Sequence, residues 1–384
     1  MPGRREAGRW WEITYDQFLL EFGFRRCTYC LRSFYLSRNG ALLLLIVHVD
    51  DTRILYTERW LFDEFLAAWT LRFDEDPDVA EQSDSFTGLS HRRVSADRIE
   101  VTCGGIMQNL AGLMADCPLP RGMVDTHPLG TDGFALLDAP ISAANPVLVE
   151  LLEKAQRIAG TVAFIVLKVR VGDSFAFCAL SRYVNAKGLT AVVWRELRRM
   201  AHHLLATRDL PLAFTRIGSG ARLEAIVDSA QNNGGMPERR SFGGYALRIG
   251  HPDGRHSAPI AWAVSLPANT TGASGHSELT QIARATSAVI GMRIFLRELG
   301  KGHLVDGHTR VFTDAKVVLD GTRCRRVSNA SKWMCTRYAM VRQAEENWAA
   351  IPTKCASELN DADIFTKPLT GAAFARAQAS IMGL

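Results

Sequence analysis

The first part of the chain changes from a helical to an alternating pattern of hydrophobic residues. Apolar residues recur at helical spacing over 10–22, and Gly23 is a suitable end for a helix. Residues 34–36 and 42–49 then predict two strands, because they are apolar and flanked by polar turns. The Asn39-Gly40 pair between them is a strong signal for a hairpin turn. A helix followed by a β-hairpin is therefore expected here.

Further elements follow as far as residue 217, and then a linker. In chain order the pattern predicts a helix over 61–69, strands over 86–94 and 99–103, a helix over 106–114, helices over 147–166 and 190–205, and a strand over 210–215. Residues 117–146 are rich in Pro, Gly and Asp and predict a long surface connection. Gly218-Ser219-Gly220 has the composition of a flexible linker. We therefore predict domains over 1–217 and 223–384, with 218–222 between them.

The second predicted domain opens with short strands separated by polar turns. Three strands, over 223–228, 244–249 and 260–264, are typical of an antiparallel meander. The remaining predicted elements are a long helix over 277–299, a strand over 310–313, a helix over 331–345, a strand over 348–351 and a short helix over 358–366. Three meandering strands followed by helix, strand, helix, strand and helix is the element order of the ribonuclease H fold.

Four acidic residues occur at the ends of these elements. Asp228 and Asp314 end strands, Glu278 lies near the start of the long helix, and Asp363 lies in the last short helix. Any one of them has a simpler explanation as a turn former or helix cap. As a set at one sheet edge, they would supply the oxygen ligands for two Mg²⁺ or Mn²⁺ ions in phosphodiester hydrolysis.

Composition limits the classes of protein that fit. A length of 384 residues allows two domains, and 47% hydrophobic with 22% charged residues is typical of a soluble protein with packed cores. The net charge of +5 permits a phosphate-rich partner without requiring one. The longest apolar run, 41–49, is too short to cross a bilayer, and no signal-peptide core is present. We therefore expect no membrane partner, an intracellular location in cytoplasm or nucleus, and reduced cysteines.

Several motifs of the second half resemble the C-terminal part of the Pol polyprotein of copia-type retrotransposons. The most specific is 362–369, which differs from the family's A-D-I-L-T-K-P-L only at Phe365. Segment 238–245 resembles D-R-K-S-T-S-G-Y, and 274–279 stands at S-S-T-E-A-E-Y with Glu278 on its second Glu. The resemblance implies a ribonuclease H-like mixed sheet with flanking helices. It also implies cleavage of the RNA strand of an RNA–DNA hybrid, with Asp228, Glu278, Asp314 and Asp363 as metal ligands.

The resemblance extends through residues 10–215, where it implies the late palm, thumb and connection of a reverse transcriptase. Residues 46–51 resemble V-Y-V-D-D, which implies catalytic metal binding by Asp50 and Asp51 at a hairpin turn. Reverse transcriptases need a third carboxylate on an earlier strand, which would lie before residue 1. We therefore expect no polymerase activity from this chain alone, unless a partner chain supplies that segment. The fold class expected for the whole chain is mixed α+β and α/β.

Three arginines on the helix predicted over 190–205 are candidates for nucleic-acid contacts. Arg195, Arg198 and Arg199 are suited to backbone phosphates, although a solvated helix face explains them equally well.

Three hypotheses remain open from the sequence. The first is a truncated retrotransposon Pol fragment with an active ribonuclease H domain. The second is a decayed or repurposed hybrid-binding protein, since Ala230-Gln231 and 332–335 depart from the family pattern near the expected substrate face. The third is a metal-dependent nuclease that acts on DNA.

Overall fold

The computed structural model describes residues 6–49, 51–79, 85–231, 240–267, 274–324, 332 and 334–384. The chain forms two compact units. The first comprises Met1–Thr87 with Gly291–Val305, and the second comprises Gly88–Ile290 with Asp306–Leu384. The predicted linker at 218–222 lies within the second unit, and the assignment of the two halves to separate domains stays a prediction.

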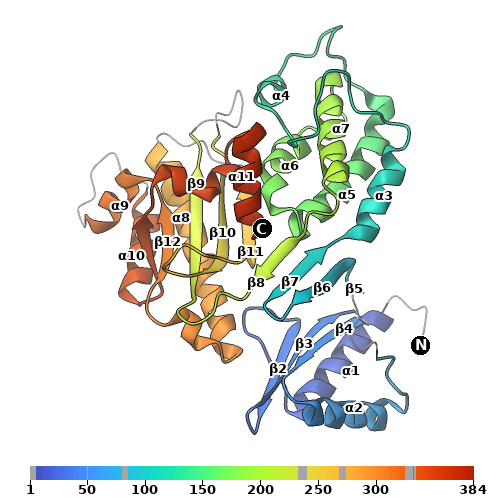
Figure 1. Cartoon of the computed structure of the whole chain (residues 1–384), viewed down its shortest axis with the longest axis vertical. Helices are drawn as coiled ribbons and strands as arrows, with labels where there is room; N and C mark the ends of the chain where they lie inside the picture. Colours follow the sequence, from blue (N-terminus) through green and yellow to red (C-terminus); the bar gives the residue numbers. More distant parts are fainter. Residues whose placement is uncertain are drawn as a thin grey trace. The chain divides into compact units, whose positions relative to one another are not determined.

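The first unit is built on an antiparallel sheet with strand order β1-β2-β3-β4 and two helices (Figure 1). Up to Thr87 its elements are α1 (Ala7–Phe22), β1 (Arg25–Arg26), β2 (Ser33–Arg38), β3 (Ala41–His48), β4 (Asp51–Tyr56), α2 (Arg59–Phe73) and the short strand β5 (Ser85–Phe86). The predicted hairpin is confirmed, with positive φ at both Asn39 (52°) and Gly40 (81°). Strand β4 was not predicted, because its side chains are exposed or half-buried and give no apolar alternation.

One face of this sheet makes the core of the first unit. Along β3, Ala41, Leu43, Leu45 and Val47 are buried, while the intervening residues are more exposed, as period-two alternation requires. These residues pack in one cluster with aromatic side chains from both helices, including Phe18. Burial of such side chains supplies most of the stabilisation of a unit of this size.

The N-terminal part of the second unit combines a small sheet with helices. Strands β6 (Leu89–Ser95), β7 (Arg98–Thr102) and β8 (Leu212–Thr215) pair antiparallel, and the helices are α3 (Gly104–Met114), α4 (Thr131–Leu136), α5 (Leu152–Lys168), α6 (Ser174–Ser181) and α7 (Ala191–Ala206). The predicted strands and the helices α3, α5 and α7 are confirmed. Helices α4 and α6 were not predicted, because helices of six and eight residues show too few periodic positions.

The C-terminal part of the second unit is a mixed five-stranded sheet in the order β11-β10-β9-β12-β13. Its strands are β9 (Arg222–Ser229), β10 (Gly243–Gly250), β11 (Ala261–Ser265), β12 (Thr309–Thr313) and β13 (Ala350–Lys354). Strands β9, β10 and β11 form the predicted antiparallel meander, which is confirmed. Strand β12 runs parallel to both β9 and β13. The central strand β9 is buried at every position after Arg222.

Helical segments cover both faces of this sheet (Figure 1). They are α8 (Ser274–Glu298), α9 (Lys316–Arg323), α10 (Cys335–Glu346), the 3₁₀ turn η6 (Asp361–Phe365) and α11 (Gly371–Met382). A Cβ at Gly243 would meet Gln281 of α8 at 2.4 Å, and one at Gly244 would meet Phe365 of η6 at 2.6 Å. Because successive strand positions point to opposite faces, α8 and η6 lie on opposite sides of β10.

A buried charged cluster joins distant parts of the second unit. Arg170 is fully buried, and its Nε lies 2.9 Å from Asp173 Oδ2. The other oxygen of Asp173 lies 3.1 Å from His203 Nε2 on α7 and accepts a 3.4 Å hydrogen bond from Gln378 on α11. These contacts satisfy charges that would otherwise be costly to bury.

Among the described helices, none has both the length and the apolar character needed to cross a membrane.

Candidate metal centre

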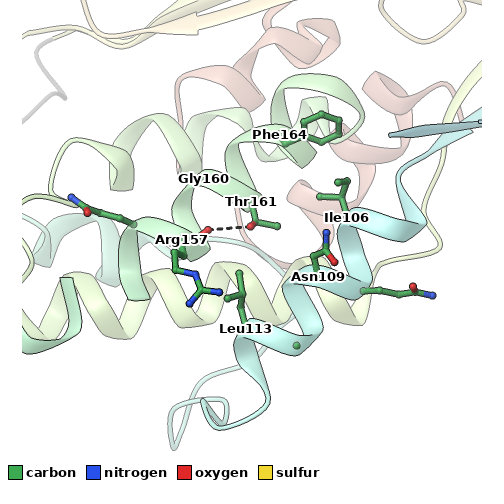
Figure 2. Close-up of a pocket in the computed structure, with 10 residues that line it drawn as sticks. Ile106, Asn109, Leu113, Arg157, Gly160, Thr161 and Phe164 are labelled. Atoms are coloured by element: carbon green, nitrogen blue, oxygen red, sulfur yellow. Dashed lines mark hydrogen bonds between the residues drawn. The ribbon is translucent and has the colours of Figure 1, made fainter. Parts of the chain in front are cut away.

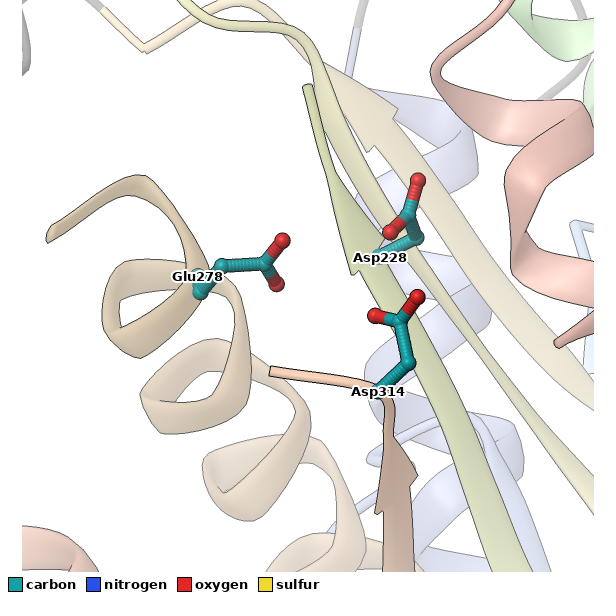
Figure 3. Close-up of side chains that lie close together, drawn as sticks. All are labelled: Asp228, Glu278 and Asp314. Atoms are coloured by element: carbon teal, nitrogen blue, oxygen red, sulfur yellow. The ribbon is translucent and has the colours of Figure 1, made fainter. Parts of the chain in front are cut away.

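Three of the predicted acidic residues meet at one edge of the mixed sheet. Strands β9 and β12 are parallel neighbours, with Ile226 opposite Phe312. Asp228 and Asp314 each lie two residues further along, so the register places them at the same edge. Glu278 reaches this edge from α8, where it lies one turn in, because the helix already includes Ser274. Ligand oxygens of Asp228, Glu278 and Asp314, the three-carboxylate cluster, lie within 4.8 Å of one another (Figure 3).

The surroundings of the cluster disfavour three negative charges. Asp228 and Glu278 are only 4% and 8% exposed. Burial, together with the charges of Asp228 and Asp314, raises the pKa of Glu278 to about 9. Burial likewise raises the pKa of Asp228 to about 6. Glu278 Oε2 is buried without a hydrogen-bond partner. A buried, unpartnered carboxylate oxygen beside two more acids is an environment that a bound cation would stabilise.

Asp363 is close to the cluster but is not one of its members. It lies in η6, and its Oδ1 accepts a 2.6 Å hydrogen bond from Lys367 Nζ. Its charge contributes to the raised pKa of Asp228, so the two carboxylates interact. The structure therefore brings together three of the four predicted ligands, and pairs the fourth with a lysine.

Sequence reasoning missed two residues that contact these acids. Thr366 donates a hydrogen bond to Asp228 Oδ2, and Lys367 forms the ion pair with Asp363. Both lie in the segment that resembles A-D-I-L-T-K-P-L, so the resemblance contained a signal for them. Their roles could not be assigned from the motif, because Asp228 lies 138 residues from Thr366 in sequence.

The predicted pair Asp50 and Asp51 is only partly described. Asp50 lies outside the described residues, as do Glu238, Arg239 and Trp333 from the segments compared with the family. Asp51 begins β4, where it is exposed and stands opposite His48 in the β3–β4 hairpin. Over the described ranges, Asp51 belongs to no group of three potential ligands. Metal binding by this pair stays a prediction.

The three predicted nucleic-acid contacts all lie on α7 but differ in exposure. Arg195 is half-buried and pairs with Glu196 at 2.9 Å, and half-buried Arg198 lies over the ring of Trp194. Arg199 is 9% exposed and donates to His127 Nε2 at 2.8 Å. The guanidinium of Arg199 is therefore already engaged inside the unit. Phosphate contacts by the set stay a prediction.

A separate hollow lies between α3 and α5. Its volume is about 740 Å³, and Ile106, Leu113 and Phe164 line it together with polar side chains and Arg157 (Figure 2). Arg157 is the one ionisable side chain among its lining residues. A hollow with a single charged group offers no pair for acid–base work and no ligand set for a metal.

Comparisons with known proteins point first to a class, the retrovirus-related Pol polyproteins of transposons. The chain is 24% identical over 379 residues to the Pol polyprotein from transposon RE2 of Arabidopsis thaliana, covering 97% of this chain and 24% of that protein. It is 22% identical over 299 residues to the Pol polyprotein from transposon RE1 of the same plant, covering 78% of this chain and 19% of that protein. No protein-family model matches the chain. The matches support a protein derived from retrotransposon Pol, and the chain spans about a quarter or less of these relatives.

Proposed function

We propose that the second unit carries a ribonuclease H-type site that hydrolyses the RNA strand of RNA–DNA hybrids. The observation that carries this proposal is the three-carboxylate cluster, in which buried acids from β9, α8 and the end of β12 converge. Carboxylates placed so closely raise one another's pKa unless a cation lies between them. The residues therefore fit a site for divalent metal.

The donor set favours a hard cation. Carboxylate oxygens are the preferred protein ligands of Mg²⁺ and suit Mn²⁺ as well. Glu278 Oε2, buried and without a partner, is available for such an ion. When bound, a pair of divalent ions would activate the attacking water and stabilise the leaving oxygen of a phosphodiester. Asp228 and Asp314 would hold the ions at the sheet edge, and Asp363 would join them if Lys367 released it.

The arrangement of the second unit also supports the proposal. Three antiparallel strands followed by two parallel ones, with Asp228 on the central strand, agree with the fold that the resemblance implies. The similarity to transposon Pol polyproteins supports an origin in such a polyprotein, and we propose that the first part is related to its reverse transcriptase. A ribonuclease H-like fold and a palm, thumb and connection remain part of the proposal.

Cleavage of a labelled RNA–DNA hybrid in Mg²⁺ tests the function. We expect RNA products from the intact chain, and a loss of about a hundredfold or more in rate for Asp314→Asn, because removing a ligand forfeits several kcal/mol of charge stabilisation. The matched control is Asp320→Asn on α9, an exposed carboxylate, which should keep the wild-type rate. Equal rates for Asp314→Asn and wild type would refute the proposal.

The other hypotheses give different outcomes in the same assay. A decayed hybrid-binding protein would bind the hybrid in a salt-sensitive way with no metal-dependent product. A DNA nuclease would cut an all-DNA duplex of the same sequence as fast as the hybrid, because it would not use contacts to the ribose 2′-OH.

A further inference from the structure

We propose that Thr366 is a positioning residue of the three-carboxylate cluster, and that its hydroxyl holds the Asp228 carboxylate in the orientation that binds a divalent cation. The inference rests on the proposed function, because it assigns the cluster a metal. It adds a residue that does not itself bind metal.

The contact between Thr366 and Asp228 is buried and directional. Thr366 is fully buried, and its Oγ1 donates to Asp228 Oδ2. The same hydroxyl lies 3.3 Å from the carbonyl oxygen of Asp363. A hydroxyl has one proton to donate, and an ionised carboxylate accepts more strongly than a carbonyl. The Thr366 hydroxyl therefore donates its one hydrogen bond to Asp228 rather than to Asp363. The Asp228 carboxylate cannot rotate without losing this hydrogen bond.

Thr366 also stands where η6 joins the end of β9. At the other end of η6, the buried Asn360 donates from Nδ2 to the carbonyl oxygen of Val227 at 3.2 Å. Its Oδ1 accepts a hydrogen bond from the backbone nitrogen of Ala362 at 3.3 Å. Both ends of the turn are thus fastened to β9. The hydrogen bond from Thr366 to the Asp228 carboxylate links this turn directly to the cluster.

The burial of both partners strengthens this role. Thr366 and Asp228 are 0% and 4% exposed, so solvent does not readily replace the hydroxyl as the donor to Asp228. Partners that orient metal ligands are typically worth about 10–100-fold in metal affinity.

Titration of the full chain with Mn²⁺, followed by calorimetry at fixed pH, tests the inference without using catalysis. Thr366→Val, which keeps the shape and removes the hydroxyl, should weaken binding about tenfold or more. Thr366→Ser should bind as the wild type does, because it restores the donor. The matched control is Thr286→Val on α8, which also removes a fully buried hydroxyl but one without a partner. It should leave Mn²⁺ affinity unchanged.

The Mn²⁺ affinities of the Thr366 variants either support or overturn the positioning role of Thr366. Wild-type affinity in folded Thr366→Val, checked by its thermal unfolding in EDTA, would overturn the inference. Failure of Thr366→Ser to restore binding would also overturn it. If the valine variant does not fold, Thr366→Ala serves for the same comparison. Mn²⁺ binding that depends on Thr366 without hybrid cleavage would uphold the inference and refute the proposed substrate, whereas no Mn²⁺ binding by the wild type would refute both.

Discussion

Replacing Glu278 with glutamine should make the metal-free protein more stable, and increasingly so as pH rises. The pKa of Glu278 is about 9 in the folded protein and has an ordinary value of 4.5. Between these values the folded state holds a proton that the unfolded state has lost. Folding stability therefore falls as pH rises through this window. Glutamine does not titrate, so the stability of the Glu278→Gln variant should not fall with pH in this way.

The size of the effect follows from the width of the window. One proton gives a slope of about 1.4 kcal/mol per pH unit. The pKa of Asp228 is about 6, so Asp228 loses its proton in the folded state near the lower end of the range from pH 6 to pH 8. Within this range the change in folding stability with pH therefore comes mainly from Glu278. Over those two pH units the wild type should lose about 3 kcal/mol relative to the variant.

Urea unfolding in EDTA at pH 6, 7 and 8 measures this difference. Glu358 provides a control, because it is exposed and is not a member of the cluster, so Glu358→Gln should follow the wild-type slope. Parallel pH profiles for wild type and Glu278→Gln would refute the reasoning. Adding Mg²⁺ should stabilise the wild type more at pH 8 than at pH 6, because the metal requires ionised ligands.

Two further substitutions test the packing of the second unit. Asp173→Asn removes the buried partner of Arg170 and should lower the free energy of unfolding by about 3–5 kcal/mol, measured by urea unfolding. Gly383→Ala should cost more stability than Gly371→Ala in the same measurement. Both glycines have positive φ, but a Cβ at Gly383 would meet the backbone oxygen of Ala213 at 2.3 Å, whereas one at Gly371 meets nothing within 4 Å. Equal losses at the two glycines would show that the close backbone approach has no cost.

Strong local patterns were sufficient to predict much of the fold. The hairpin at Asn39-Gly40 and the meander of β9, β10 and β11 were predicted, because turn chemistry and apolar runs are local signals. Helix α11 was not predicted. It is rich in alanine, and only Phe374, Ile381 and Met382 are large buried apolar residues in it. The last strand begins at Ala350 rather than Trp348, whose positive φ of 56° marks a turn.

The candidate site was predictable in part for a similar reason. Asp228 and Asp314 end apolar strands, so their positions follow from the sequence once the strands are neighbours. The pairing of Asp363 with Lys367 and the bond from Thr366 to Asp228 depend on how η6 packs against β9. Such contacts join residues that only the tertiary fold brings together, so no local pattern reveals them.

The contribution of α11 to the core has a consequence for synthesis of the chain. Phe374, Ile381 and Met382 belong to the same buried cluster as Val101, and Gln378 reaches Asp173. Met382 is synthesised nearly three hundred residues after Val101. Until Met382 has emerged, a nascent second unit must leave apolar surface and the Arg170–Asp173 pair incompletely covered. Folding of the second unit can therefore be completed only after α11 has been synthesised.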